Sequence, residues 1–144
     1  MANYGAHAFV WIGDWNVDDG NHAIEQAGIV GFDFIEIPLL KPAEFDAASH
    51  RAALEKAGIS ATCSLVLPKD AHMPHQPDKA REFLISALDE VEKLGSQYLG
   101  GCIGYSLGTL TGVPPTDEER ETVVQVLRVL HDMRDLSRHL SEPG

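Results

Sequence analysis

Side chains that could carry chemistry are spread along this sequence rather than clustered in one motif. Glu36 lies among apolar neighbours, which is unusual for a carboxylate. No second carboxylate or metal ligand is close to it in sequence, so we favour a hydrogen-bonded structural role over a general base. His72 and His75 have an i, i+3 spacing that suits a metal site on a helix. Because they lie in a proline-rich segment, we favour exposed loop histidines instead.

Two cysteines and a pair of glycines fall inside expected strands. Cys63 and Cys102 have no neighbours in the sequence that would lower a thiol pKa, so we expect both to be packing residues. Glycine weakens a strand, and Gly100 and Gly101 therefore indicate the close approach of a ligand or of another backbone. The run Gly100–Gly104 lacks the Gly-x-Gly-x-x-Gly order directly before a helix, which argues against a nucleotide site.

The elements that must position these residues alternate between strand and helix. Strand patterns cover residues 4–11, 33–39, 59–67 and 98–105, and an amphipathic helical pattern follows each of them. Such alternation predicts an α/β fold with parallel βαβ units. A closed (β/α)₈ barrel needs about 250 residues, so four units in 144 residues predict a partial TIM barrel. We expect one domain, 1–144, truncated after the fourth helix.

Local signals mark the ends of these helices. Gly31 and Gly58 follow the first two helical patterns and indicate their C-terminal ends. Thr116 and Glu119 have the spacing of a capping box before the fourth helix. A half barrel should leave apolar residues of the barrel interior incompletely covered, namely Phe9, Ile35, Leu65 and Ile103.

Composition excludes several kinds of partner. The net charge of −11 makes binding to nucleic acid or to an anionic membrane unfavourable, because both need a basic protein surface. The first residues have no basic, apolar leader pattern, and no run approaches the roughly 20 apolar residues that span a bilayer. We therefore expect a cytoplasmic protein without nucleic-acid or membrane partners.

Four pieces of the sequence have a distinctive order and spacing: Gly5–Trp15 (GAHAFVWIGDW), Gly31–Leu39 (GFDFIEIPL), the helix start Pro77-Asp78, and Leu94–Tyr105 (LGSQYLGGCIGY). In this order they resemble the N-terminal half of the D-tagatose 3-epimerase/D-psicose (allulose) 3-epimerase family, within the xylose isomerase-like TIM barrels. The resemblance extends to about residue 137. The tail, residues 134–144, departs from the family pattern, which would continue into a fifth strand.

The resemblance implies where the chemistry of such enzymes lies. In that family a divalent metal, commonly Mn²⁺ (or Mg²⁺ or Co²⁺), holds O2 and O3 of a ketose sugar, and two glutamates move the C3 proton. The metal ligands and those glutamates sit on strands five to eight. The resemblance therefore implies no catalytic residue, no metal ligand and no cofactor within this chain.

The resemblance also implies roles for residues that are present. His7 matches a position that lines the sugar pocket, where it either bonds a sugar hydroxyl or is an internal histidine satisfied by a backbone carbonyl. Trp15 matches an apolar wall of the pocket. The remaining substrate contacts fall at Ser64 (or Cys63) and at Gly101 and Cys102. Glu36 matches a glutamate that supports the barrel floor or the residues around the pocket.

Three functional hypotheses remain open. In the first, the chain is half of a metal-dependent ketose 3-epimerase-like sugar isomerase that acts in carbohydrate metabolism and is inactive alone. The second is a non-catalytic assembly module that self-associates through open barrel edges, since an edge strand presents unpaired backbone groups. The third is a fragment of a hydroxypyruvate isomerase or inosose dehydratase relative. Whether the isolated chain is an enzyme is left open by the sequence.

Overall fold

The computed structural model describes residues 1–141, with side chains described as far as Arg134. Four strands form one sheet in the order β1-β2-β3-β4, namely Gly5–His7, Phe34–Pro38, Ser60–Leu67 and Leu99–Ser106. The pairs β1/β2 and β2/β3 are parallel. The expected α/β fold with a parallel sheet is confirmed. Of the tail that departs from the family pattern, residues 142–144 lie outside the described residues.

The first strand is shorter than the sequence pattern predicts. It ends at His7, and a 3-10 turn, η1 (Ala8–Val10), follows directly. The side chain of His7 caps this turn by accepting a hydrogen bond from the Phe9 backbone N–H. The turn thus ends the strand, although the apolar sequence continues beyond His7. The strand pattern in the sequence gives no sign of this turn.

Four helices follow the strands: α1 (Val17–Val30), α2 (Ala47–Ala57), α3 (Pro77–Leu94) and α4 (Asp117–Ser141). Helices α1 and α2 end at glycines in the left-handed conformation, with φ of +93° at Gly31 and +69° at Gly58. At the start of α4, Thr116 and Glu119 form the expected capping box. No helix in residues 1–141 is long and apolar enough to cross a membrane.

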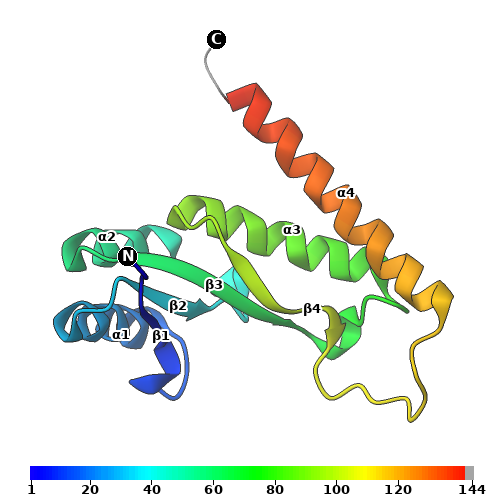
Figure 1. The fold of residues 1–144 in the computed structure, drawn as a ribbon, viewed down its shortest axis with the longest axis horizontal. Helices are drawn as coiled ribbons and strands as arrows, with labels where there is room; N and C mark the ends of the chain where they lie inside the picture. Colours follow the sequence, from blue (N-terminus) through cyan, green and yellow to red (C-terminus); the bar gives the residue numbers. More distant parts are fainter. Residues whose placement is uncertain (142–144) are drawn as a thin grey trace. The chain divides into compact units, whose positions relative to one another are not determined.

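The chain divides into two compact units, each of which draws on two stretches of sequence. The first unit is Met1–Leu65 with Ser86–Gly101, and the second is Val66–Ile85 with Cys102–Gly144. In the first unit, α1 and α2 pack side by side (Figure 1). The single-domain prediction for 1–144 stays a prediction.

Burial alternates along β2 and β3, as it does when one face of a sheet is covered. On the covered face, Ile35 and Ile37 are fully buried, and Cys63 and Leu65 are at most 3% exposed. Because side chains alternate between faces, the residues between these lie on the other face of the sheet. That face, which we call the open face, carries partly exposed side chains, namely Phe34, Glu36, Thr62 and Ser64.

The face assignments correct one expectation. Ile35 and Leu65 are predicted from the sequence to be incompletely covered residues of the barrel interior, but they are 0% and 1% exposed. They belong to the covered face of the sheet. Phe9, expected in the same set, is 45% exposed, and it lies in η1 after the end of β1.

Candidate functional site

Polar side chains gather on the open face of the first unit. The strand register places His7 opposite Glu36 and Glu36 opposite Thr62. Ser64 lies two residues farther along β3, opposite Pro38. A buried sheet interface would normally be apolar, so a row of imidazole, carboxylate and hydroxyl groups indicates a face that contacts water or a polar ligand.

His7 and Glu36 form the centre of this row. His7 Nε2 lies 3.8 Å from Glu36 Oε1, and their side chains are 34% and 43% exposed. His7 Nδ1 accepts the Phe9 backbone N–H at 3.1 Å, so the neutral ring carries its proton on Nε2. The pair thus offers one N–H donor and one carboxylate acceptor, which together match a ligand hydroxyl group. Neither of the two sequence-based alternatives for His7, a sugar contact or a backbone-carbonyl contact, is tested by these contacts.

Trp15 belongs to an aromatic cluster with Phe45 and His50. Its ring stacks on Phe45 at a centroid distance of 6.2 Å and lies 4.9 Å from the ring of His50. His50 is 1% exposed, and its Nδ1 lies 2.9 Å from Asn21 Oδ1. Burial lowers the pKa of His50, although the nearby Asp46 opposes this, so the ring is neutral at pH 7.

The cluster lines a small cavity of about 200 Å³, together with Pro38 and Leu40. Two buried nitrogen atoms in the cluster, Trp15 Nε1 and His50 Nε2, have no hydrogen-bond partner among the described residues. No local pattern singles out His50, because its side-chain hydrogen bond with Asn21 and its ring contact with Trp15 come from residues 29 and 35 positions away. Trp15 therefore borders a cavity, and its role as a wall of a sugar pocket stays a prediction.

Gly101 approaches a neighbouring backbone closely. Its φ is +102°, and a Cβ at this position would overlap the carbonyl oxygen of Leu65 on β3. Of the two explanations left open by the sequence, the approach of another backbone holds for Gly101. At Gly100 a Cβ would meet no atom within 4 Å, so no described group explains that glycine.

The two cysteines differ in their surroundings. Cys63 is 3% exposed, and burial raises its pKa to about 11. It therefore packs in the core, as expected, and Ser64 is the neighbour that reaches the open face. The packing role predicted for Cys102 is wrong, because Cys102 is exposed on β4 in the second unit. Its side chain is free to meet a ligand, but no contact described for it tests the substrate role.

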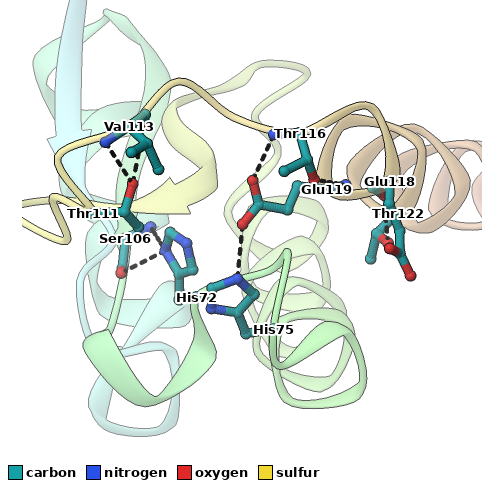
Figure 2. A network of polar contacts seen from close by, with 9 residues as sticks. All are labelled: His72, His75, Ser106, Thr111, Val113, Thr116, Glu118, Glu119 and Thr122. Carbon is teal, nitrogen blue, oxygen red and sulfur yellow. Dashed lines mark hydrogen bonds and ion pairs between the residues drawn. The ribbon is translucent and has the colours of Figure 1, made fainter.

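A polar network in the second unit brings His72 and His75 together (Figure 2). Their ring centroids are 5.2 Å apart. His72 is 6% exposed and bonds Ser106, whereas His75 is exposed and pairs with Glu119 at 2.8 Å. The prediction of exposed loop histidines is thus right for His75 and wrong for His72. The hydrogen-bond partner of His72, Ser106, lies 34 residues away, beyond the reach of local pattern analysis.

Comparison with known proteins gives the context of these sites. No protein-family model matches the chain. Over 133 residues the chain is 35% identical to an L-ribulose 3-epimerase of Methylomonas sp. (strain DH-1), covering 90% of this chain and 46% of that protein. Over 104 residues it is 32% identical to a ketose 3-epimerase of Arthrobacter globiformis, covering 69% and 36% of the two proteins.

A solved structure agrees with these relatives. The crystal structure of a D-allulose 3-epimerase from Methylomonas sp. in complex with D-allulose matches with a TM-score of 0.84 and 34% identity. The match covers 90% of this chain and 46% of that chain. The chain resembles the ketose 3-epimerases. This confirms the family resemblance seen in the sequence and the fold prediction of four βα units of a TIM barrel.

The resemblance to ketose 3-epimerases covers only part of those proteins. The chain spans about half of the length of the Methylomonas relative and of the matching crystal structure. Of the residues implied as contacts, the structure places His7 and Ser64 on the open face of one sheet, with Glu36 beside His7. It does not join Trp15 to that row through any described contact.

Proposed function

We propose that this chain is the N-terminal half of a metal-dependent ketose 3-epimerase and supplies one wall of its sugar pocket. The observation that carries the proposal is the polar row on the open face of a sheet that matches a D-allulose-bound epimerase. Active sites of TIM barrels lie at the C-terminal ends of the strands, and His7 is the last residue of β1. His7 and Ser64 would contact sugar hydroxyl groups, and Glu36 would hold His7 in place.

The proton transfer belongs to residues that this chain does not supply. Moving a proton at a carbon next to a carbonyl requires a positioned base and a group that stabilises the enediolate. Among the described side chains, which extend to Arg134, no group of three or more His, Cys, Asp or Glu could hold a metal ion. His7 and Glu36 offer only two metal-binding side chains, whereas Mn²⁺ has an octahedral set of ligands. The described residues do not fit the implied Mn²⁺ site, and no step is assigned through it.

Reconstitution tests this proposal directly. The chain is joined to the complementary half of the Methylomonas relative, and conversion of D-fructose to D-allulose is measured with added Mn²⁺. We expect turnover from the joined protein and only background from each half, because losing the base and the metal removes several kcal/mol of transition-state stabilisation. A folded joined protein without turnover would contradict the proposal.

Variants of the joined protein separate the roles within the wall. His7→Ala should raise the KM by about tenfold, the effect of one lost hydrogen bond to a sugar hydroxyl, with a smaller change in kcat. Ala43→Gly, at an exposed position, is the matched control and should change neither constant. Turnover by the isolated chain above a metal-only reaction would show that the catalytic residues lie within it, with Glu36 and His7 the first to substitute.

A second candidate is self-association through the sheet edges. In the described sheet, β1 and β4 are the terminal strands, and each presents backbone groups that no neighbouring strand pairs on one side. Sedimentation of the isolated chain over a range of concentrations tests it. A constant monomer mass rejects this candidate without affecting the epimerase proposal.

A further inference from the structure

The second unit contains a cavity that none of the proposed sugar contacts uses. Its volume is about 440 Å³, within the range of small-molecule sites. Apolar walls come from the loop after β4 and from the ring of Tyr105, and include Leu110 and Val113. The side chains of Thr109 and Thr111 also line the cavity, and their hydroxyl groups are bonded to Ser106 and to the Val113 backbone. His72 and Glu119 border the same space. The chemistry of these two side chains decides what the cavity can hold.

The hydrogen bonds of His72 fix the position of its proton. The backbone N–H of Ser106 points at His72 Nδ1, with an N···N distance of 3.2 Å, and the Ser106 hydroxyl lies 3.0 Å from the same atom. A backbone N–H can only donate, so Nδ1 is an acceptor, and the neutral ring carries its proton on Nε2. Burial and the neighbouring His75 lower the pKa of His72, although Glu119 opposes this. His72 therefore presents a fixed N–H donor at Nε2, for which no described residue provides an acceptor.

Glu119 presents the opposite function. Its Oε2 accepts the backbone N–H of Thr116 at 2.8 Å, and its Oε1 lies 2.8 Å from His75 Nε2. These hydrogen bonds, the one from Thr116 foremost, lower the pKa of Glu119 and keep it ionised at neutral pH. Figure 2 shows the carboxylate held between these two partners. Each carboxylate oxygen has a second lone pair and can accept a further hydrogen bond.

The Nε2–H donor of His72 and the carboxylate acceptor of Glu119 border one cavity, and together they select the ligand by its functional groups. We propose that this cavity binds a neutral hydroxyl-bearing compound, a small alcohol or polyol, which accepts from His72 Nε2–H and donates to Glu119. The ligand's C–H groups would pack on the Tyr105 ring and on the apolar side chains of the loop. This inference does not rest on the proposed epimerase role.

Other ligand classes fit less well. The side chains around the cavity include no lysine or arginine, and the Glu119 carboxylate repels an anion. A metal ion needs an unprotonated ring nitrogen, and the Ser106 N–H occupies the only one that His72 has. An ammonium group could pair with Glu119, but it has no lone pair with which to accept from His72.

Nuclear magnetic resonance of the histidine rings in the intact chain tests the proposal. Long-range ¹H–¹⁵N spectra should show His72 protonated on Nε2 only, and a proton on Nδ1 would overturn the argument. Xylitol, a neutral acyclic polyol, should shift the His72 signals saturably. The anion D-gluconate, the cation methylammonium and Mn²⁺ should leave them in place. Absence of any xylitol effect, or equal binding of one of the charged probes, would also overturn it.

Two variants and a control make the test specific. His72→Asn keeps an acceptor near the Nδ1 position but removes the Nε2 donor, so xylitol affinity should fall at least tenfold. Val113→Trp, at a side chain that is 68% exposed, should fill the cavity and abolish binding while the His72 tautomer stays unchanged. His22→Asn, at an exposed position on α1, is the control and should bind as the original chain does. Unchanged binding in Val113→Trp would place the ligand elsewhere.

Discussion

Gly20 is the residue whose substitution best tests the packing of the aromatic cluster. It lies on α1 where the helix passes Trp15 and His50. A Cβ at this position would lie 2.6 Å from Trp15 Cζ2 and 2.9 Å from His50 Cε1. Both distances are well below van der Waals contact, so Gly20→Ala must move one of two ring systems that are packed against each other.

Two opposing terms set the size of the effect. Alanine stabilises a helix by about 1 kcal/mol relative to glycine. Overpacking a filled site costs about 1–3 kcal/mol. The net change is a loss of about 0–2 kcal/mol of unfolding free energy, and at the upper limit the Tm of a chain of this size falls by about 4–8 °C.

Thermal unfolding and tryptophan fluorescence together provide the measurement. A Trp11→Phe background leaves Trp15 as the only tryptophan, so its emission reports the displacement of the ring. Gly100→Ala is the matched control, because a Cβ there meets no atom within 4 Å, and its Tm should stay the same or rise slightly. The packing argument would be refuted if Gly20→Ala raised the unfolding free energy by the full amount of about 1 kcal/mol that alanine adds in a helix, with unchanged Trp15 emission.

Three further predictions concern other contacts. Cys102 is exposed and should react rapidly with a thiol reagent at pH 8 in the folded chain. Cys63 should react only on unfolding, because it is buried and its pKa of about 11 leaves roughly one thiolate in 1,000. A Cys102→Ser variant should lose the rapid reaction. The pKa values of His50 and His72 are lowered in the folded chain, so the unfolded chain binds more protons than the folded chain near and below the ordinary histidine pKa of 6.5. Stability should therefore be complete above pH 7 and fall with the pH below about 6, as a urea-unfolding series would show. Thr116→Ala removes the side chain that caps α4 through the Glu119 N–H, and it should lower the unfolding free energy by about 1 kcal/mol, whereas Thr116→Ser should not.

The parts of the fold that sequence reasoning predicted are those governed by local chemistry. Gly31 and Gly58 end their helices at positive φ, where glycine has no steric penalty. The capping box before α4 needs only residues three positions apart. Each of these signals lies within a few residues of the structure it determines, so one sequence is enough to find it.

The errors have a common cause in contacts between distant residues. Ile35 and Leu65 were assigned to the wrong face, because apolar residues occur at both alternate positions in parts of these strands, and a shift of one residue exchanges the faces. The sequence predicts an exposed loop residue at His72, because its hydrogen-bond partner Ser106 is remote in the chain. The side-chain hydrogen bond of His50 also comes from a remote residue, Asn21, so the sequence gives no sign of it.

The close approach of Gly101 to Leu65 limits how this part of the chain can evolve. Any replacement of Gly101 adds a Cβ that collides with the β3 backbone, and it also forces a side chain into a positive φ. Every amino-acid substitution of Gly101 is therefore expected to disturb the spacing between β3 and β4. Ser64, whose side chain lies on the open face, carries no such restriction. Changes in ligand preference would then accumulate at Ser64 and at similar positions, while Gly101 stays fixed.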